Sequence, residues 1–232
     1  MQKPKLNKFV SKQTSMKNYK PSIDLDSDED EDDDEPSSVT RLGYFKRSAL
    51  SHEYTIYIDE DFGTPAKYRN VCNVIANATE DDVVKFEISS YGGRLDGLTS
   101  LLSAMLKTDA TTECTINGAC KSAAVMLALH CDNIMVSPFA DVLVHHASYG
   151  TNGKASDVLA QVTHTHNYTN DLFRSTFKNF LTEDEIELAL NGKEFHMQAD
   201  EFTRRLKIKM ELEELEQKDK PEEEPTDESE YD

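Results

Sequence analysis

The sequence of 232 residues contains no tryptophan, and its longest apolar run, Ala123–Leu129, is only seven residues long. A helix needs about 20 apolar residues to cross a bilayer, so the sequence predicts no membrane-spanning segment and no membrane partner. The first residues, MQKPKLNKFV, lack the apolar stretch of a signal peptide. We therefore expect a cytoplasmic protein rather than a secreted one.

Several sequence motifs are also absent. No CxxC pair occurs among the four cysteines, which are Cys72, Cys114, Cys120 and Cys131. We therefore expect buried, reduced thiols and no metal site. HExxH, GxxxxGK[ST] and GxGxxG are missing, which leaves zinc proteolysis, nucleotide hydrolysis and dinucleotide chemistry without support and predicts no cofactor. GxSxG is missing too, and too little chain separates Ser122 from His145 to hold the acid of an α/β-hydrolase triad.

Acidic residues outnumber basic ones by 44 to 25, but the net charge of −19 is unevenly distributed. Residues 1–23 hold six lysines and no acid, residues 24–35 ten acids and no base, and residues 207–232 twelve acids and four lysines. Nucleic-acid binding needs clustered Lys and Arg, so the overall acidity argues against it. Such charged segments cannot bury apolar surface. We expect a disordered N-terminal segment at 1–42, one folded domain at 43–206 and an acidic tail at 207–232 that begins as a helix.

Strand and helix patterns alternate within 43–206. Period-two patterns predict strands over 53–58, 83–88, 112–116, 133–137 and 141–145. Helical spacing predicts helices over 64–78, 95–106, 123–131, 155–180 and 183–190, the last capped by Thr182. This alternation predicts an α/β fold with a largely parallel sheet.

A turn with two glycines, Ser89–Gly93, follows the predicted strand 83–88. Glycines there let the backbone come close to a bound chain and direct N–H groups outward, as an oxyanion hole requires. The same residues also suit an ordinary strand-to-helix turn, which is the more frequent role of such a sequence.

Ser122 lies between a predicted strand and the apolar helix that begins at Ala123. A serine there has its hydroxyl close to free backbone N–H groups, which suits a nucleophile. An N-capping serine is the alternative interpretation. Lys121 is adjacent, but neighbouring side chains at a helix start diverge, so a Ser–Lys dyad is disfavoured.

Two histidines, His145 and His146, end the predicted strand 141–145. Sites in α/β proteins form at the carboxyl edge of the sheet, so one histidine could accept a serine proton there. Successive side chains on a strand face opposite ways, so at most one of the two shares a pocket with Ser122. A purely structural histidine is the alternative.

Together these segments resemble the proteolytic subunit of the Clp protease, a self-compartmentalising serine peptidase. Ser89–Gly93 is similar to the family's Asn-Ser-Pro-Gly-Gly turn, Gly118–Ala123 to its Gly-x-Ala-Ala-Ser-Met, and Leu143–Ala147 to its Met-Ile-His-Gln-Pro. Residues 153–157 resemble the Gly-Gln-Ala-Thr-Asp that opens the family's handle helix. Residues 195–202 resemble Arg-Phe-Leu-Ser-Ala-Pro-Glu-Ala, which puts the catalytic aspartate's position on Glu194.

The resemblance implies the Clp protease and crotonase fold for residues 43–206, with repeated β-β-α units and a protruding handle helix at about 155–180. It also implies a serine endopeptidase and a role for each matching residue. The catalytic triad would be Ser122, His145 and Glu194. The oxyanion hole would consist of Gly93 and Ala123, and the substrate-binding turn of Ser90, Tyr91 and Gly92.

The same resemblance implies a homo-oligomer of stacked heptameric rings that cleaves polypeptides delivered by an ATP-driven AAA+ unfoldase. Several positions depart from the family pattern: Ser89 replaces Asn, Tyr91 replaces Pro, Cys120-Lys121 replaces Ala-Ala, and Glu194 replaces Asp. These departures keep a catalytically inactive ring subunit open as an alternative. An acyl-CoA enzyme of the related crotonase fold is a second alternative. The third is a phage-encoded protease that processes capsid or scaffold proteins during head maturation without an unfoldase.

Overall fold

The structure is a computed structural model that describes residues 44–48 and 51–218. The disorder predicted for residues 1–42 and for the end of the acidic tail lies outside the described residues. Within them, seven strands form one sheet: β1 (Tyr44–Ser48), β2 (His52–Ile58), β3 (Val83–Ser90), β4 (Thr111–Lys121), β5 (Asn133–Val136), β6 (Asp141–Val144) and β7 (Phe195–Gln198).

The helices of the described chain begin with a short 3₁₀ helix, η1 (Pro65–Tyr68). The α-helices are α1 (Arg69–Asn77), α2 (Leu95–Met105), α3 (Ala123–Leu129), α4 (Ala155–Phe177), α5 (Glu183–Leu190) and α6 (Ala199–Lys218). None of these described helices combines the length and apolar character needed to span a membrane.

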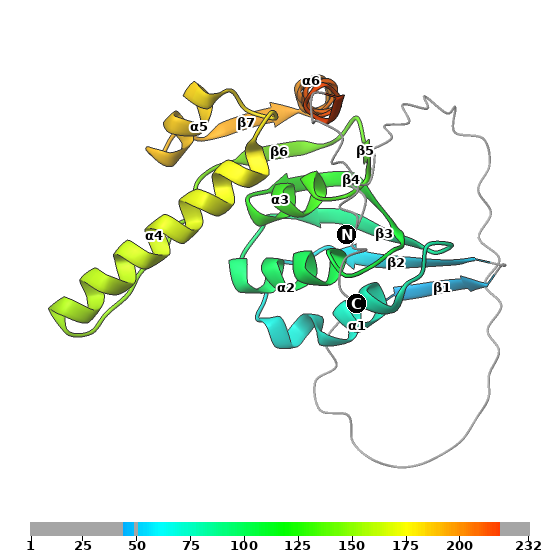
Figure 1. Cartoon of the computed structure of the whole chain (residues 1–232), viewed down its shortest axis with the longest axis horizontal. Coiled ribbons are helices and arrows are strands. Elements are labelled where there is room, and N and C mark those ends of the chain that lie inside the picture. Colours follow the sequence, from blue (N-terminus) through cyan, green and yellow to red (C-terminus); the bar gives the residue numbers. More distant parts are fainter. Residues whose placement is uncertain (1–43, 49–50, 219–232) are drawn as a thin grey trace, which may run out of the picture.

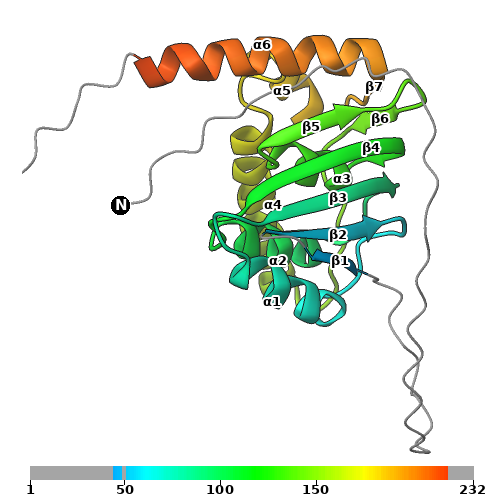
Figure 2. The same ribbon diagram turned by 90° about the vertical axis from the view of Figure 1, so that its right-hand side faces the viewer.

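The strand order is β1-β2-β3-β4-β6-β7, and β5 pairs with the first part of β4. The pairings among β2, β3, β4, β5 and β6 are parallel, whereas the edge strands β1 and β7 run antiparallel to their neighbours. The predicted α/β fold with a largely parallel sheet is thus confirmed (Figures 1 and 2).

The core lies between the sheet and the helices α1, α2 and α3 (Figure 2). Alternate side chains of β3 are fully buried against these helices, namely Val84, Phe86 and Ile88. Every residue of α3 is buried, which explains why its sequence is apolar all round. The cysteines carry free thiols, of which Cys114, Cys120 and Cys131 are buried as expected and Cys72 is half-buried.

Some element boundaries differ from the predictions. The predicted helix 64–78 starts as η1. The strand predicted over 112–116 is too short, because β4 continues to Lys121 and its last residues pair with β6. The predicted helix 155–180 ends at Phe177, close to Asn179, whose φ of 65° turns the chain.

Helix α4 projects from the body of the fold (Figure 1). Its buried residues all lie in its C-terminal half: Thr169, Phe173, Thr176 and Phe177. The N-terminal half is mostly exposed and contributes no buried residue to the core of the described chain. Its role as a handle between rings stays a prediction.

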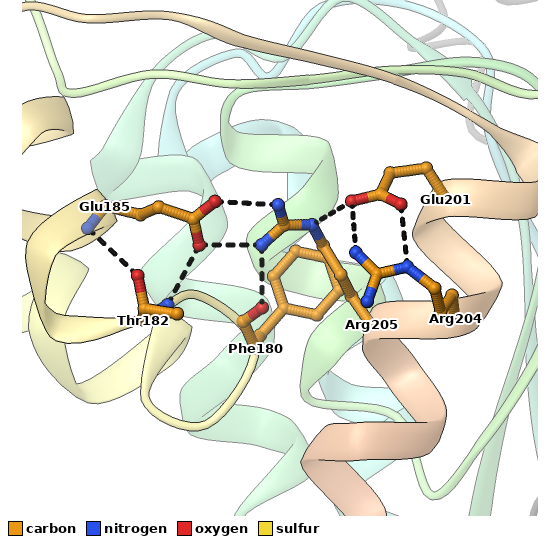
Figure 3. Close-up of polar contacts among 6 residues, drawn as sticks. All are labelled: Phe180, Thr182, Glu185, Glu201, Arg204 and Arg205. Atoms are coloured by element: carbon orange, nitrogen blue, oxygen red, sulfur yellow. Dashed lines mark hydrogen bonds and ion pairs between the residues drawn. The ribbon is translucent and has the colours of Figure 1, made fainter.

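A network of ion pairs connects α5 with α6 (Figure 3). The predicted cap of α5 is confirmed, because the Thr182 hydroxyl accepts from the N–H of Glu185 in a capping box. Arg205 donates to both carboxylate oxygens of Glu185, at 2.8 and 2.7 Å, and to Glu201 at 2.7 Å. These bonds from Arg205, together with the Thr182 cap, lower the pKa of Glu185 to about 2.

We predict that Arg205→Gln lowers the free energy of unfolding at pH 7 by about 2 kcal/mol, because its partner carboxylate at Glu185 is left half-buried and unpaired. The folded-state pKa of Glu185, about 2, lies below its ordinary value of 4.5, so this stabilisation is complete above pH 4.5 and is lost as the pH falls through about 2. The difference between wild type and variant should shrink accordingly in urea unfolding at low pH.

Arg204→Gln is the matched control, since Arg204 also pairs with Glu201 but is 58% exposed against 15% for Arg205. We expect it to cost less than about 1 kcal/mol. Equal losses in the two variants would contradict the role given to Arg205.

Candidate active site

Ser122 joins the end of β4 to the start of α3 with φ 54° and ψ −122°. A non-glycine residue in this region costs on the order of 1–3 kcal/mol and persists only where its surroundings fix it. The Ser122 side chain makes no capping bond to α3, so the alternative of an N-capping serine is wrong. A strained serine between a strand and a helix is the geometry of a nucleophile elbow, here without the GxSxG motif.

The strained backbone of Ser122 is held from two sides. Its N–H donates to the carbonyl oxygen of Leu143 at 2.8 Å, extending the β4–β6 pairing of Lys121 with Leu143. Its own carbonyl oxygen accepts from the N–H of Val125 at 3.0 Å, which ties it to the buried helix α3.

The turn after β3 closes the third side of Ser122. Gly92 has a φ of +99°, and a Cβ added there would lie 2.6 Å from the carbonyl oxygen of Lys121 and 2.7 Å from the Cβ of Ser122. Only glycine fits this approach. Ser90 fixes the turn from within, because its buried hydroxyl donates to the Glu60 carbonyl oxygen at 2.8 Å and accepts from Gly92 N–H at 3.1 Å.

Gly93 forms a parallel bridge with Phe62. Phe62 N–H donates to the Gly92 carbonyl oxygen at 2.6 Å, and Arg94 N–H donates to the Phe62 carbonyl oxygen at 2.9 Å. Both bonds use the neighbours of Gly93, so its own N–H and C=O point away from Phe62. Ala123 is the first residue of α3, a position whose N–H has no acceptor within its own helix.

A cleft of about 510 Å³ brings several of the predicted site residues together. Tyr91, Gly93, Ser122 and His145 line it, alongside Asp61, Arg94, Leu95, Asp96, Ala147, Ser148, Tyr149, Thr165, Tyr168 and Thr169. Glu194 lies outside this lining. Among the hydrogen bonds of residues 51–218, none joins the side chains of Ser122 and His145.

Glu194 lies between two imidazole rings. Its Oε1 is 3.6 Å from Nδ1 of His145, and its Oε2 is 3.5 Å from Nε2 of His196. Both distances slightly exceed normal hydrogen-bond length. The acid thus faces the Nδ1 edge of His145, which leaves Nε2 as the ring's other polar atom. His196 was not singled out in the sequence, although residues two apart in an extended segment share a face.

His146 turns away from the cleft. Its ring packs edge-on against His166 and Phe173, with ring centroids 6.3 and 5.9 Å away. Burial lowers the pKa of His146, and its Nε2 is buried without a hydrogen-bond partner among the described residues. Of the two histidines, His145 is therefore the one that shares a cleft with Ser122.

Lys121 is occupied by other groups. Its Nζ lies 2.7 Å from Oδ2 of Asp141 and 5.1 Å from the centroid of the Tyr91 ring. The hydrogen bond to Asp141 raises the pKa of Lys121, so the ammonium stays protonated and is unsuited to act as a general base for Ser122. As for metals, no group of three or more His, Cys, Asp or Glu within the described ranges is placed to hold an ion.

The chain was compared with models of known protein families and with curated proteins. The model of the Clp protease family matches residues 44–204 of this chain. A search of curated proteins finds no match. The matched range contains all the strands and the cleft described above.

We predict that Gly92→Ala destabilises the protein by about 2–4 kcal/mol, because the new methyl group meets backbone atoms that cannot retreat. Gly192→Ala is the matched control, since Gly192 has a similar φ of +95° but open space around it. That change should cost only backbone strain, about 1 kcal/mol. Urea unfolding of the two variants measures the difference, and equal losses would show that the close approach to Ser122 is not tight.

Proposed function

Because this chain belongs to the Clp protease family, we propose that it is a serine endopeptidase in which Ser122, His145 and Glu194 form the catalytic triad. The observation that carries this proposal is the strained backbone of Ser122, at a strand-to-helix turn in the cleft that His145 also lines. Strain of this kind marks functional residues, since it lowers stability and needs several elements to maintain it.

In the proposed mechanism the Ser122 Oγ attacks the carbonyl carbon of the scissile bond while His145 Nε2 takes the hydroxyl proton. His145 then gives that proton to the leaving amine, and a water molecule, activated in the same way, hydrolyses the acyl-enzyme. No hydrogen bond joins the side chains of Ser122 and His145, and catalytic hydrogen bonds of this kind often become short and aligned only when substrate binds.

Glu194 would orient His145 and stabilise the imidazolium that forms during attack. Its Oε1 faces Nδ1 of His145 at 3.6 Å, the side opposite the atom that receives the proton. The developing oxyanion would be stabilised by the N–H groups of Gly93 and Ala123. The outward direction of the Gly93 N–H supports this role.

The substrate would bind as an extended chain along the turn 90–93, pairing with the outward N–H and C=O of Gly93 in the manner of an added strand. Ser90 and Gly92 would shape this turn rather than contact the reacting bond, since Ser90 is buried and Gly92 abuts Ser122. Tyr91, which is 69% exposed, would border the bound peptide.

We further propose that the protein works as a cytoplasmic homo-oligomer of stacked heptameric rings, with α4 as the handle between rings and an ATP-driven unfoldase as a partner. The projecting half of α4 supports this, because it exposes Leu159 and Val162 to solvent. An inactive ring subunit is the second candidate, favoured by the residues around Ser122 that depart from the family pattern, namely Tyr91, Cys120 and Lys121. Labelling with a fluorophosphonate separates the two, because only an activated serine reacts.

We predict that a fluorophosphonate labels the wild-type protein and that Ser122→Ala abolishes the labelling. Ser148→Ala is the matched control, because Ser148 lines the same cleft on an exposed loop, and it should be labelled like the wild type. Intact-mass measurement of both variants gives the stoichiometry. Labelling that survives in Ser122→Ala would overturn the assignment of the nucleophile, and an unlabelled wild type would favour the inactive subunit.

We predict that Glu194→Gln slows labelling about a hundredfold or more, since an amide no longer stabilises the imidazolium. Glu187→Gln is the control, because Glu187 is similarly exposed and pairs with Arg174, outside the cleft. Rates are compared by stopping the reaction at successive times. A rate for Glu194→Gln equal to that of the control would remove Glu194 from the triad.

A further inference from the structure

We propose that Asp61 forms a subsite for a lysine or arginine side chain of the substrate. The inference rests on the peptidase function proposed above and names a preference of the same cleft. Asp61 lines this cleft together with Ser122 and His145. Its carboxylate makes no ion pair or hydrogen bond with any other residue in the described part of the chain.

The backbone on both sides of Asp61 is fixed to the substrate-binding turn. The carbonyl oxygen of Glu60 accepts from the hydroxyl of Ser90 at 2.8 Å. Phe62 bonds through its N–H to Gly92 and through its carbonyl oxygen to Arg94, at 2.6 and 2.9 Å. The backbone of Asp61 is therefore held in place before substrate arrives, which lowers the entropic cost of binding a partner.

The other charges of the cleft cancel each other. Arg94 donates from Nε and Nη2 to the two carboxylate oxygens of Asp96, at 3.0 and 2.6 Å. Outside the cleft, Glu60 is paired with Lys67 at 2.9 Å. Asp61 is left as the uncompensated charge of the lining, so the cleft favours a cation and disfavours an anionic side chain.

Three tyrosine rings complete the cation-binding character of the cleft: Tyr91, Tyr149 and Tyr168. Aromatic faces attract ammonium and guanidinium groups. The protein itself provides an example, because the Nζ of Lys121 lies 5.1 Å from the centroid of Tyr91 while it pairs with Asp141. A carboxylate and one tyrosine ring thus hold a lysine together beside this cleft.

The distance across the turn selects long side chains. A peptide paired with the outward edge of Gly93 lies one strand spacing from the turn. The segment that contains Asp61 lies one strand spacing from the turn on the opposite edge, beside Phe62. Two such spacings are about 10 Å. The long stems of Lys and Arg suit this separation, whereas short polar side chains do not.

The test uses pairs of fluorescent octapeptides that differ only in lysine against norleucine, with this residue moved through each position. Binding to the Ser122→Ala protein is measured by anisotropy, so the result does not depend on turnover. At one position we expect lysine to bind about fivefold tighter than norleucine, and less so in high salt. Asp61→Asn in the same background should reduce this ratio to about one, and Asp61→Lys should favour glutamate.

Asp59→Asn is the matched control, since Asp59 is an exposed neighbour outside the cleft lining, and it should keep the ratio. An equal affinity for the two peptides at every position would overturn the subsite, as would a lysine preference that survives Asp61→Asn. The proposed peptidase function would be overturned by a different result, namely a wild-type protein whose serine a fluorophosphonate does not label. The two failures are therefore distinguishable.

Discussion

The strained backbone of Ser122 is the constraint on which the rest of the site depends. Its φ of 54° is stable only because three elements close around it: β6 through the Leu143 carbonyl, α3 through its wholly buried body, and Gly92 through direct contact. The strain is offset by the packing of the fold's interior. The same three elements therefore determine where the hydroxyl, the adjacent N–H of Ala123 and the turn 90–93 lie relative to one another.

The direction of the strands explains why the remaining residues meet there. The turn 90–93 follows β3, Ser122 follows β4 and His145 follows β6, and parallel strands end at the same edge of the sheet. Glu194 directly precedes β7, which runs antiparallel to β6, so the start of β7 lies at the edge of the sheet where β6 ends. The pairing of Val144 with Phe195 makes Glu194 and His145 neighbours across β6 and β7.

The sequence predicted the parts of the fold whose hydrophobic period is local, such as β2, β3, α2 and the capped helix α5. It missed β1 and β7, which are short edge strands, and it ended β4 too early because residues 119–121 are held by β6, a partner distant in sequence. The strain at Ser122, the contact of Glu194 with His196 and the position of Asp61 also escaped prediction. Each depends on how closely separate segments of the chain approach one another, and the spacing of hydrophobic residues in the sequence carries no information about that.

The departures from the family pattern are each matched by a neighbour in the structure. Cys120 points into the core, whereas Lys121 reaches sideways to Asp141 and to the ring of Tyr91, which is itself a departure. The longer acid at Glu194 lies within 3.6 Å of His145 with His196 on its other side. The bonds that hold the backbone of Ser122 run to backbone atoms of Leu143 and Val125, and of the departing residues only Tyr91 lines the cleft. Under the proposed peptidase function, divergence of this kind argues for altered substrate preference more than for lost activity.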